Sequence, residues 1–201
     1  MTKRSAFTLV ELLVVICILA VLAALTLPGI RTALARANSA KCQSNLRQIG
    51  IAMNGYLNEH EQVYPSAMGK NGETTPWMWR LQPYTSMPAN AMGFAPLPRA
   101  AGIFLCPEFH PPGREVAYGL NASMDPSYSF PTWNFRVLNV PAISTFLVVE
   151  MAVNTELFSP ASNGDVARRH PQKSANFLFV DGHVENISAE VPRTDTRWFR
   201  Q

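Results

Sequence analysis

The fold of this chain is decided near its start by residues 3–16, which read KRSAFTLVELLVVI. The apolar run that begins there continues to Ile30, and Glu11 is the one charged residue within it. Burying a carboxylate near the start of a membrane-length helix is costly unless a positive group meets it. We therefore expect Glu11 either to have a cationic partner or to mark a function.

The apolar run is long enough to cross a membrane. Residues 12–30 carry no charge, and a bilayer core requires about 20 such residues. A secretory signal peptide has a shorter apolar stretch of about 7–15 residues, followed by a small-x-small cleavage site. Residues 28–32, PGIRT, do not form such a site, so a membrane span is favoured over a removable signal peptide.

The basic pair, the small residue and the FTLVELLVVI stretch resemble the N-terminal signature of type IV pilins and of type II secretion pseudopilins. The resemblance implies that prepilin peptidase cuts between Ala6 and Phe7 and that the new amine of Phe7 is then methylated. It also implies that Glu11 is the glutamate, fifth from the new terminus, that serves assembly. The chain departs from the family in having Ala6 where glycine is usual.

The implied cleavage would give Glu11 a partner. It creates an ammonium group four residues before Glu11, and opposite charges attract strongly in a medium of low dielectric constant. If subunits stack with a stagger, the amine of one can neutralise Glu11 of its neighbour and set the register of assembly. The alternative is that Glu11 reaches the lipid headgroups as part of an ordinary anchor.

Composition limits the partners and the size of the remaining domain. Of the 201 residues, those after the span suffice for one soluble domain. The net charge of +3 is small and sits largely beside the span, so we expect no nucleic-acid partner. Basic residues lie on both sides of the span and do not set its orientation. The resemblance places the protein in the bacterial inner membrane as a single-pass protein with a periplasmic C-terminal domain.

An amphipathic stem helix is predicted to follow the span. Residues 31–58 contain no proline, and one apolar stripe recurs at steps of three and four residues: Cys42, Leu46, Ile49, Met53 and Tyr56. We divide the chain into a leader (1–6), a transmembrane and assembly helix (7–30), the stem helix (31–58) and a loop-rich β head (59–201).

The head is predicted to contain short strands. Residues 137–140 and 145–150 are rich in β-branched or aromatic side chains. Residues 175–180 and 183–187 flank Asp181-Gly182, which predicts a hairpin with a two-residue turn of positive φ. The expected fold is α+β and pilin-like: a long N-terminal helix, transmembrane plus stem, packed against a small antiparallel sheet.

A second resemblance covers the stem and the head. His170 followed by Asp181-Gly182 is similar to the C-terminal His…Asp-Gly motif of prepilin-like proteins abundant in planctomycetes, verrucomicrobia and related bacteria, although ten residues separate the two parts instead of nine. Residues 41–50 and 104–107 also resemble that group. Because the resemblance places the head in an oxidising compartment, Cys42 and Cys106 are candidates for a disulfide, and two free cysteines are equally compatible with the sequence.

Metal binding and catalysis receive little support from the sequence. His170, Asp181 and His183 are metal-ligand types, and some related pseudopilins bind calcium in the head. The hairpin turn already explains Asp181, however, and the stretch lacks the several oxygen ligands that calcium prefers. We therefore expect no metal and no cofactor. No nucleophile-elbow, zinc-protease or phosphate-loop motif is present, so we expect no enzyme.

The sequence thus predicts a pilin-like structural subunit of a type II secretion pseudopilus, serving protein secretion, or of a type IV pilus-like fibre. Its expected partners are prepilin peptidase, other pilin or pseudopilin subunits and the inner membrane. The alternative is a membrane-anchored extracytoplasmic binding module that does not assemble.

Overall fold

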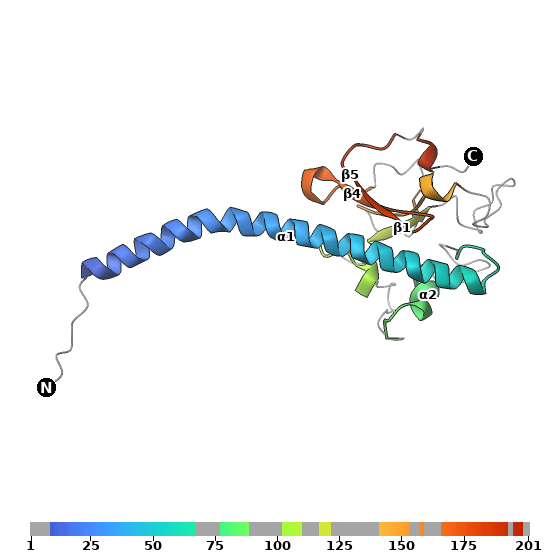
Figure 1. Cartoon of the computed structure of the whole chain (residues 1–201), viewed down its shortest axis with the longest axis horizontal. Helices are drawn as coiled ribbons and strands as arrows, with labels where there is room; N and C mark the ends of the chain where they lie inside the picture. Colours follow the sequence, from blue (N-terminus) through green and yellow to red (C-terminus); the bar gives the residue numbers. More distant parts are fainter. Residues whose placement is uncertain are drawn as a thin grey trace. The chain divides into compact units, whose positions relative to one another are not determined.

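The computed structural model describes residues 9–66, 77–88, 102–109, 117–121, 141–152, 157–158, 166–192 and 195–198, and their elements are drawn in Figure 1. The chain forms two compact units, Met1–Ala37 and Asn38–Gln201. The strand predicted at 137–140 lies outside the described residues.

The long helix α1, Leu9–Glu59, supplies all that is described of the first unit. Its large apolar side chains from Leu9 to Leu34 are 45–80% exposed. They occupy consecutive positions, so apolar surface surrounds the helix instead of forming one stripe. By length and composition this helix can cross a membrane.

Threonine side chains accompany the proline inside α1. Pro28 lacks a backbone N–H and leaves a carbonyl of the preceding turn without its helical donor. The Thr26 hydroxyl donates to the carbonyls of Leu22 (3.0 Å) and Ala23 (3.2 Å), and the Thr32 hydroxyl donates to that of Pro28 (3.1 Å). These bonds add donors on both sides of the proline, and the carbonyl that loses its helical donor is that of Ala24.

In the second unit, α1 buries the predicted apolar stripe. All five stripe residues are at most 8% exposed, which confirms that prediction. At Gly50 an added Cβ would meet Leu178 at 3.2 Å, and at Gly55 it would meet Tyr84 at 2.9 Å. At 100° per residue these glycines point about 140° apart on the helix. The helix therefore packs closely on the sheet from one side and on the segment around Tyr84 from another.

Within the described residues, the sheet has five strands in the order β3-β1-β2-β4-β5. The strands are β1 (Tyr118–Asn121), β2 (Phe146–Glu150), β3 (Leu157–Phe158), β4 (Ala175–Phe179) and β5 (Val184–Ile187). Every neighbouring pair is antiparallel except β1 with β3, which is parallel. The α+β prediction is confirmed, with the parallel edge strand as an addition.

Short helices complete the described part of the second unit. These are α2 (Trp77–Leu81), η2 (Gln82–Tyr84), η3 (Gly102–Phe104), η6 (Ala142–Ser144), η8 (Pro171–Lys173) and η9 (Thr196–Trp198). Figure 1 shows α2 on the side of α1 that faces away from the sheet.

The sheet is buried on both faces at β1, β2 and β4, whereas β5 is partly exposed. One face joins α1 and α2 in a cluster that includes Leu46, Trp77 and Leu178. The other face carries an aromatic cluster in which the ring centroids of Phe177 and Trp198 lie 4.6 and 4.8 Å from that of Phe146. β2 and β4 are therefore buried on both faces, which explains why their residues are apolar apart from Glu150 and Asn176.

The predicted hairpin forms, but the predicted two-residue turn is wrong. The register pairs Leu178 with Val184, and the Phe179 N–H donates to the His183 carbonyl at 2.9 Å. Three residues, 180–182, therefore connect the strands. Gly182 alone among them has a positive φ, of 91°. This matches a three-residue loop that ends in a left-handed glycine, a turn that also follows the strand twist.

Candidate functional site

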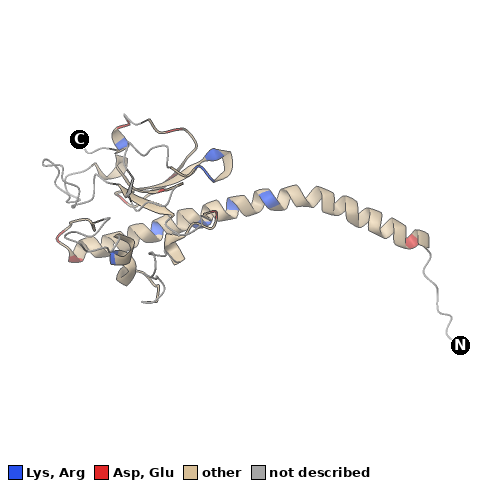
Figure 2. Ribbon diagram, turned by 180° about the vertical axis from the view of Figure 1, so that it is seen from behind, with Lys and Arg blue, Asp and Glu red and all other residues tan. Residues whose placement is uncertain are grey.

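The predicted processing site and the assembly glutamate lie at the start of the chain. Ala6 and Phe7 are outside the described residues. Glu11 lies in the first turn of α1 and is exposed. An acidic side chain is favourable there because the amino end of a helix carries partial positive charge. The basic residues of α1, drawn blue in Figure 2, all follow the apolar run: Arg31, Arg36, Lys41 and Arg47.

A disulfide joins the stem to the head in the second unit. Cys42 of α1 and Cys106, just after η3, are bonded, with their Cα atoms 5.3 Å apart. Both residues are buried, at 0% and 2% exposure. The link closes a loop of 64 residues. In the chain-entropy account, closing a loop of that length stabilises the folded state by about 4 kcal/mol.

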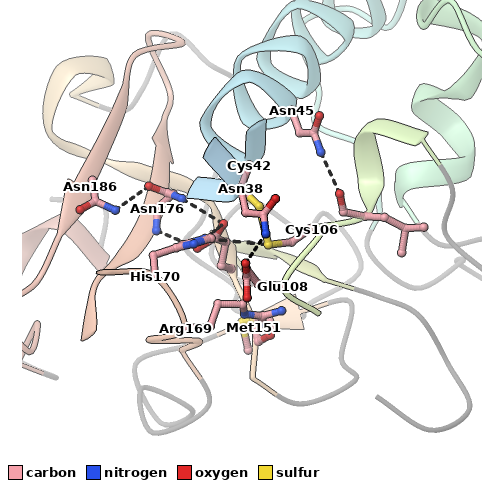
Figure 3. Close-up of a disulfide and its surroundings, with 12 residues drawn as sticks. Asn38, Cys42, Asn45, Cys106, Glu108, Met151, Arg169, His170, Asn176 and Asn186 are labelled. Carbon is pink, nitrogen blue, oxygen red and sulfur yellow. Dashed lines mark hydrogen bonds and ion pairs between the residues drawn. A yellow bond between two sulfur atoms is a disulfide. The ribbon is translucent and has the colours of Figure 1, made fainter. Parts of the chain in front are cut away.

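A buried histidine–glutamate pair lies beside the disulfide, and Figure 3 shows His170 next to Cys106. His170 Nε2 is 2.8 Å from Glu150 Oε1, and both side chains are fully buried. The same ring nitrogen lies 3.8 Å from Cys106 Sγ. His170 precedes η8, whereas Glu150 ends β2. The tertiary structure thus brings together a helix, a loop and a strand that are far apart in sequence.

Amide groups hold the Glu150 carboxylate in place. Asn176 of β4 donates to it from the backbone N–H (3.0 Å, to Oε2) and from the side-chain amide (3.1 Å, to Oε1). Asn186 of β5 donates in turn to the side-chain carbonyl of Asn176 at 2.7 Å. A buried carboxylate needs such donors, because desolvation is otherwise strongly unfavourable. The network explains why polar residues interrupt two strands of the sheet.

An arginine interacts with the acid of this pair. Burial lowers the pKa of Arg169, and the nearby Glu150 carboxylate acts in the opposite direction. The Arg169 guanidinium donates to the carbonyl of Met151 and stands 4.4 Å above the centre of the Phe109 ring. Burial first, and Glu150 second, raise the pKa of Tyr118, which keeps its phenol neutral. The arginine therefore places positive charge next to a buried acid.

The second half of the His…Asp-Gly motif lies elsewhere, at the exposed hairpin. Asp181 Oδ1 accepts the backbone N–H of His183 (3.1 Å) and lies 2.6 Å from its Nδ1. The His183 ring stacks on Phe179, with the centroids 4.0 Å apart. These contacts shape the turn that Gly182 completes. His170 belongs to the buried cluster instead, so the two parts of the motif serve different places in the fold.

Of the three metal-ligand candidates from the sequence, Asp181 and His183 lie together at the hairpin, whereas His170 lies in the buried cluster. Within the described residues, one group of three or more metal-ligand side chains has its ligand atoms close together: Cys42, Cys106, Glu150 and His170, all within 4.8 Å of one another. Sequence reasoning missed Glu150, which ends an apolar strand. The sequence signal for Glu150 is an acidic residue at a strand position that the pattern predicts to be buried.

Comparison with known families gives two matches. Residues 1–27 match the family described as the prokaryotic N-terminal methylation motif. Residues 33–94 match a family described as a protein of unknown function, DUF1559. No curated protein and no solved structure matches the chain.

Proposed function

We propose that this chain, a pilin-like prepilin protein with a single-pass membrane anchor, is a structural and non-catalytic subunit of a type II secretion pseudopilus or a type IV pilus-like fibre. One observation supports the proposal above others. The described part of the first unit is a helix whose large apolar side chains are exposed on every face, and residues 1–27, which include the start of this helix, match the methylation motif. Apolar surface of this extent requires lipid or neighbouring apolar helices.

Assembly from the membrane uses the same helix in two environments. Prepilin peptidase removes residues 1–6 at the membrane, and the amine of Phe7 is methylated. The helix then leaves the bilayer of the bacterial inner membrane and packs among the helices of other subunits. The head, which carries the disulfide, lies on the periplasmic side, where thiols are oxidised.

Glu11 gives the assembly its register. The new amine of one subunit meets the Glu11 carboxylate of a staggered neighbour inside the helix bundle. Each charge alone would be expensive to bury, whereas the pair is attractive in a medium of low dielectric constant. Apolar packing alone would allow the helices to slide, because neighbouring turns offer similar surfaces.

Mass spectrometry of the mature N-terminus tests the processing step. The protein is extracted from membranes of cells that contain or lack prepilin peptidase. With the peptidase we expect a chain that begins at N-methylated Phe7, and without it a chain that keeps Met1 to Ala6. An Ala6→Gly variant restores the residue usual in the family and should be cut at least as completely. A chain that keeps its leader in the presence of the peptidase would contradict the proposal.

The alternative, an anchored binding module that does not assemble, has one observation in its favour. A groove of about 440 Å³ beside α1 in the second unit is lined by polar and apolar side chains, among them Lys41, Gln48, Tyr84 and Met87. A soluble ligand could occupy a groove of this size. Crosslinking through the membrane helix separates the two functions, because a non-assembling module gives no ladder of like subunits.

A further inference from the structure

The disulfide region combines four side chains of the types that bind zinc. Two are cysteines, one is a histidine and one is a glutamate: Cys42, Cys106, His170 and Glu150. All four residues are at most 3% exposed, and their ligand atoms lie within 4.8 Å of one another. In this structure the two sulfurs are bonded to each other.

We propose that the chain with this disulfide reduced binds one Zn²⁺ ion through these four side chains, and that forming the disulfide releases the ion. Thiolate, imidazole and carboxylate groups in a tetrahedron are the donors of structural zinc sites. With Zn–S bonds near 2.3 Å and Zn–N and Zn–O bonds near 2.0 Å, neighbouring ligand atoms lie about 3.3–3.8 Å apart. Side-chain adjustments of about 1–2 Å bring the four atoms to that spacing.

The histidine already presents one nitrogen to the other ligands. His170 Nε2 is the atom that approaches Glu150 Oε1 and Cys106 Sγ. Its Nδ1 is buried and has no hydrogen-bond partner among the residues that the structure describes. The ring therefore makes its polar contacts through Nε2 alone. With the proton on Nδ1, the lone pair of Nε2 points at the cluster, as zinc requires.

The Glu150 carboxylate is fixed by outer hydrogen bonds, as metal-binding carboxylates usually are. Asn176 donates two hydrogen bonds to Glu150, and Asn186 fixes Asn176. Outer hydrogen bonds of this kind orient metal ligands and raise affinity.

Charge balance also fits a zinc ion. Two thiolates and a carboxylate carry a total charge of −3, so the site with Zn²⁺ would carry −1. Arg169, next in the chain to His170, adds a positive charge that interacts with Glu150. The buried site with its arginine is then neutral, which avoids the cost of an unbalanced buried charge.

The replacement of bound zinc by a disulfide requires an oxidant that takes up two electrons, such as oxidised glutathione. One protein thiolate attacks the oxidant and displaces a glutathione thiolate, which gives a mixed disulfide. The second protein thiolate attacks the mixed disulfide, displaces the other glutathione thiolate and closes the bond between Cys42 and Cys106. The protein sulfurs lose two electrons, glutathione gains them, and Zn²⁺ leaves with two of its ligands gone. Both the zinc ion and the disulfide would therefore join the stem to the head.

Cobalt provides a coloured probe for the zinc site. The full-length chain carries Cys17→Ser, which removes the exposed third cysteine, and is kept in detergent with a phosphine reductant and no oxygen. We expect one Co²⁺ per chain with thiolate-to-cobalt absorption, displaced by one Zn²⁺. The oxidised chain should show no such absorption. Adding oxidised glutathione to the zinc form should release one Zn²⁺ for each disulfide formed, as measured with a coloured chelator.

Two histidine variants make the test specific. His170→Ala should weaken cobalt and zinc binding at least about tenfold, whereas His183→Ala, which removes an exposed histidine, should leave binding unchanged. If the reduced chain has lost its near-UV circular dichroism, zinc should restore it. Three results would each overturn the proposal: no thiolate–cobalt absorption in the folded reduced chain, equal binding by His170→Ala, or a reduced unfolded chain that zinc does not refold.

Discussion

His170 and Glu150 form a buried pair at 2.8 Å, with both side chains fully removed from solvent. Asp181 and His183 form a second histidine–carboxylate pair at 2.6 Å, with side chains 32% and 42% exposed. The chain thus carries the same chemical pair in two environments. This contrast allows the effect of burial to be measured within one protein.

Replacing each histidine by alanine should affect stability very differently. His170→Ala removes the imidazole beside the buried Glu150 carboxylate and should lower the free energy of unfolding by about 3–5 kcal/mol. His183→Ala breaks an exposed pair and should cost less than about 1 kcal/mol. All four tryptophans lie in the second unit, so tryptophan fluorescence in urea reports its unfolding. Equal losses in the two variants would contradict the assigned roles.

Removing the disulfide should destabilise the second unit without affecting the first. Cys106→Ala opens the 64-residue loop and should lower the free energy of unfolding by about 4 kcal/mol under oxidising conditions. Cys17→Ser, at an exposed cysteine of the first unit, is the matched control and should leave that value unchanged. Peptide mapping without reductant should recover Cys42 and Cys106 in one linked fragment, and separate fragments would refute the link.

The acid stability of the second unit should depend on Asp195. Its hydrogen bonds from Arg197, at 2.8–2.9 Å, lower the pKa of Asp195 below its ordinary value. A carboxyl whose pKa is lowered by folding adds stability above its unfolded pKa of about 4, and this stability is lost as the pH falls through the folded pKa. Asp195→Asn should therefore lower the free energy of unfolding at neutral pH and make its decrease in acid smaller. Urea unfolding between neutral pH and about pH 2 tests this, and Glu190→Gln, which removes an exposed carboxylate outside the pair, should keep the wild-type profile.

The hairpin turn should be sensitive to the backbone at Gly182. Its φ of 91° is unfavourable for residues with a Cβ, although no atom lies within 4 Å of the position that a Cβ would take. Gly182→Ala should therefore cost about 1–2 kcal/mol through the backbone alone. Gly182→Asn should cost less, because asparagine tolerates positive φ better. Urea unfolding gives both values, and an alanine variant as stable as wild type would show that the turn can relax.

Assembly should depend on the charge of Glu11. Cys17 lies six residues further along the same exposed apolar helix, so oxidative crosslinking in membranes reports contact between the helices of neighbouring subunits. Glu11→Leu should abolish ordered fibres and sharply reduce Cys17-linked dimers, because the amine of the neighbouring subunit loses its partner. Glu190→Gln, a charge change in the second unit, should leave both unchanged. Undiminished fibres from Glu11→Leu would refute the proposed pairing.

Local patterns were sufficient to predict much of the fold. The steps of three and four residues from Cys42 to Tyr56 predicted the buried face of α1, because helix geometry alone places such residues on one side. The segment around Asp181-Gly182 predicted a hairpin, because strand and turn preferences act within a few residues. The type of turn was missed, since it depends on the strand register.

The buried network could not be predicted in the same way. Glu150 and His170 are 20 residues apart, and Cys106 is separated from His170 by 64. Their contact depends on how β2 pairs with β4 and on how α1 packs on the sheet. No local preference encodes these relations. The sequence motif groups His170 with Asp181-Gly182, whereas the structure gives the two parts different neighbours.

The amino-acid sequence by itself determined the apolar N-terminal helix, its lone acid and the amphipathic continuation, because these follow from hydropathy and helical periodicity along one segment. Only the tertiary structure decided that Cys42, Cys106, Glu150 and His170 meet in a dry interior. The reason is that burial and charge pairing depend on distances through space between segments that share no local pattern.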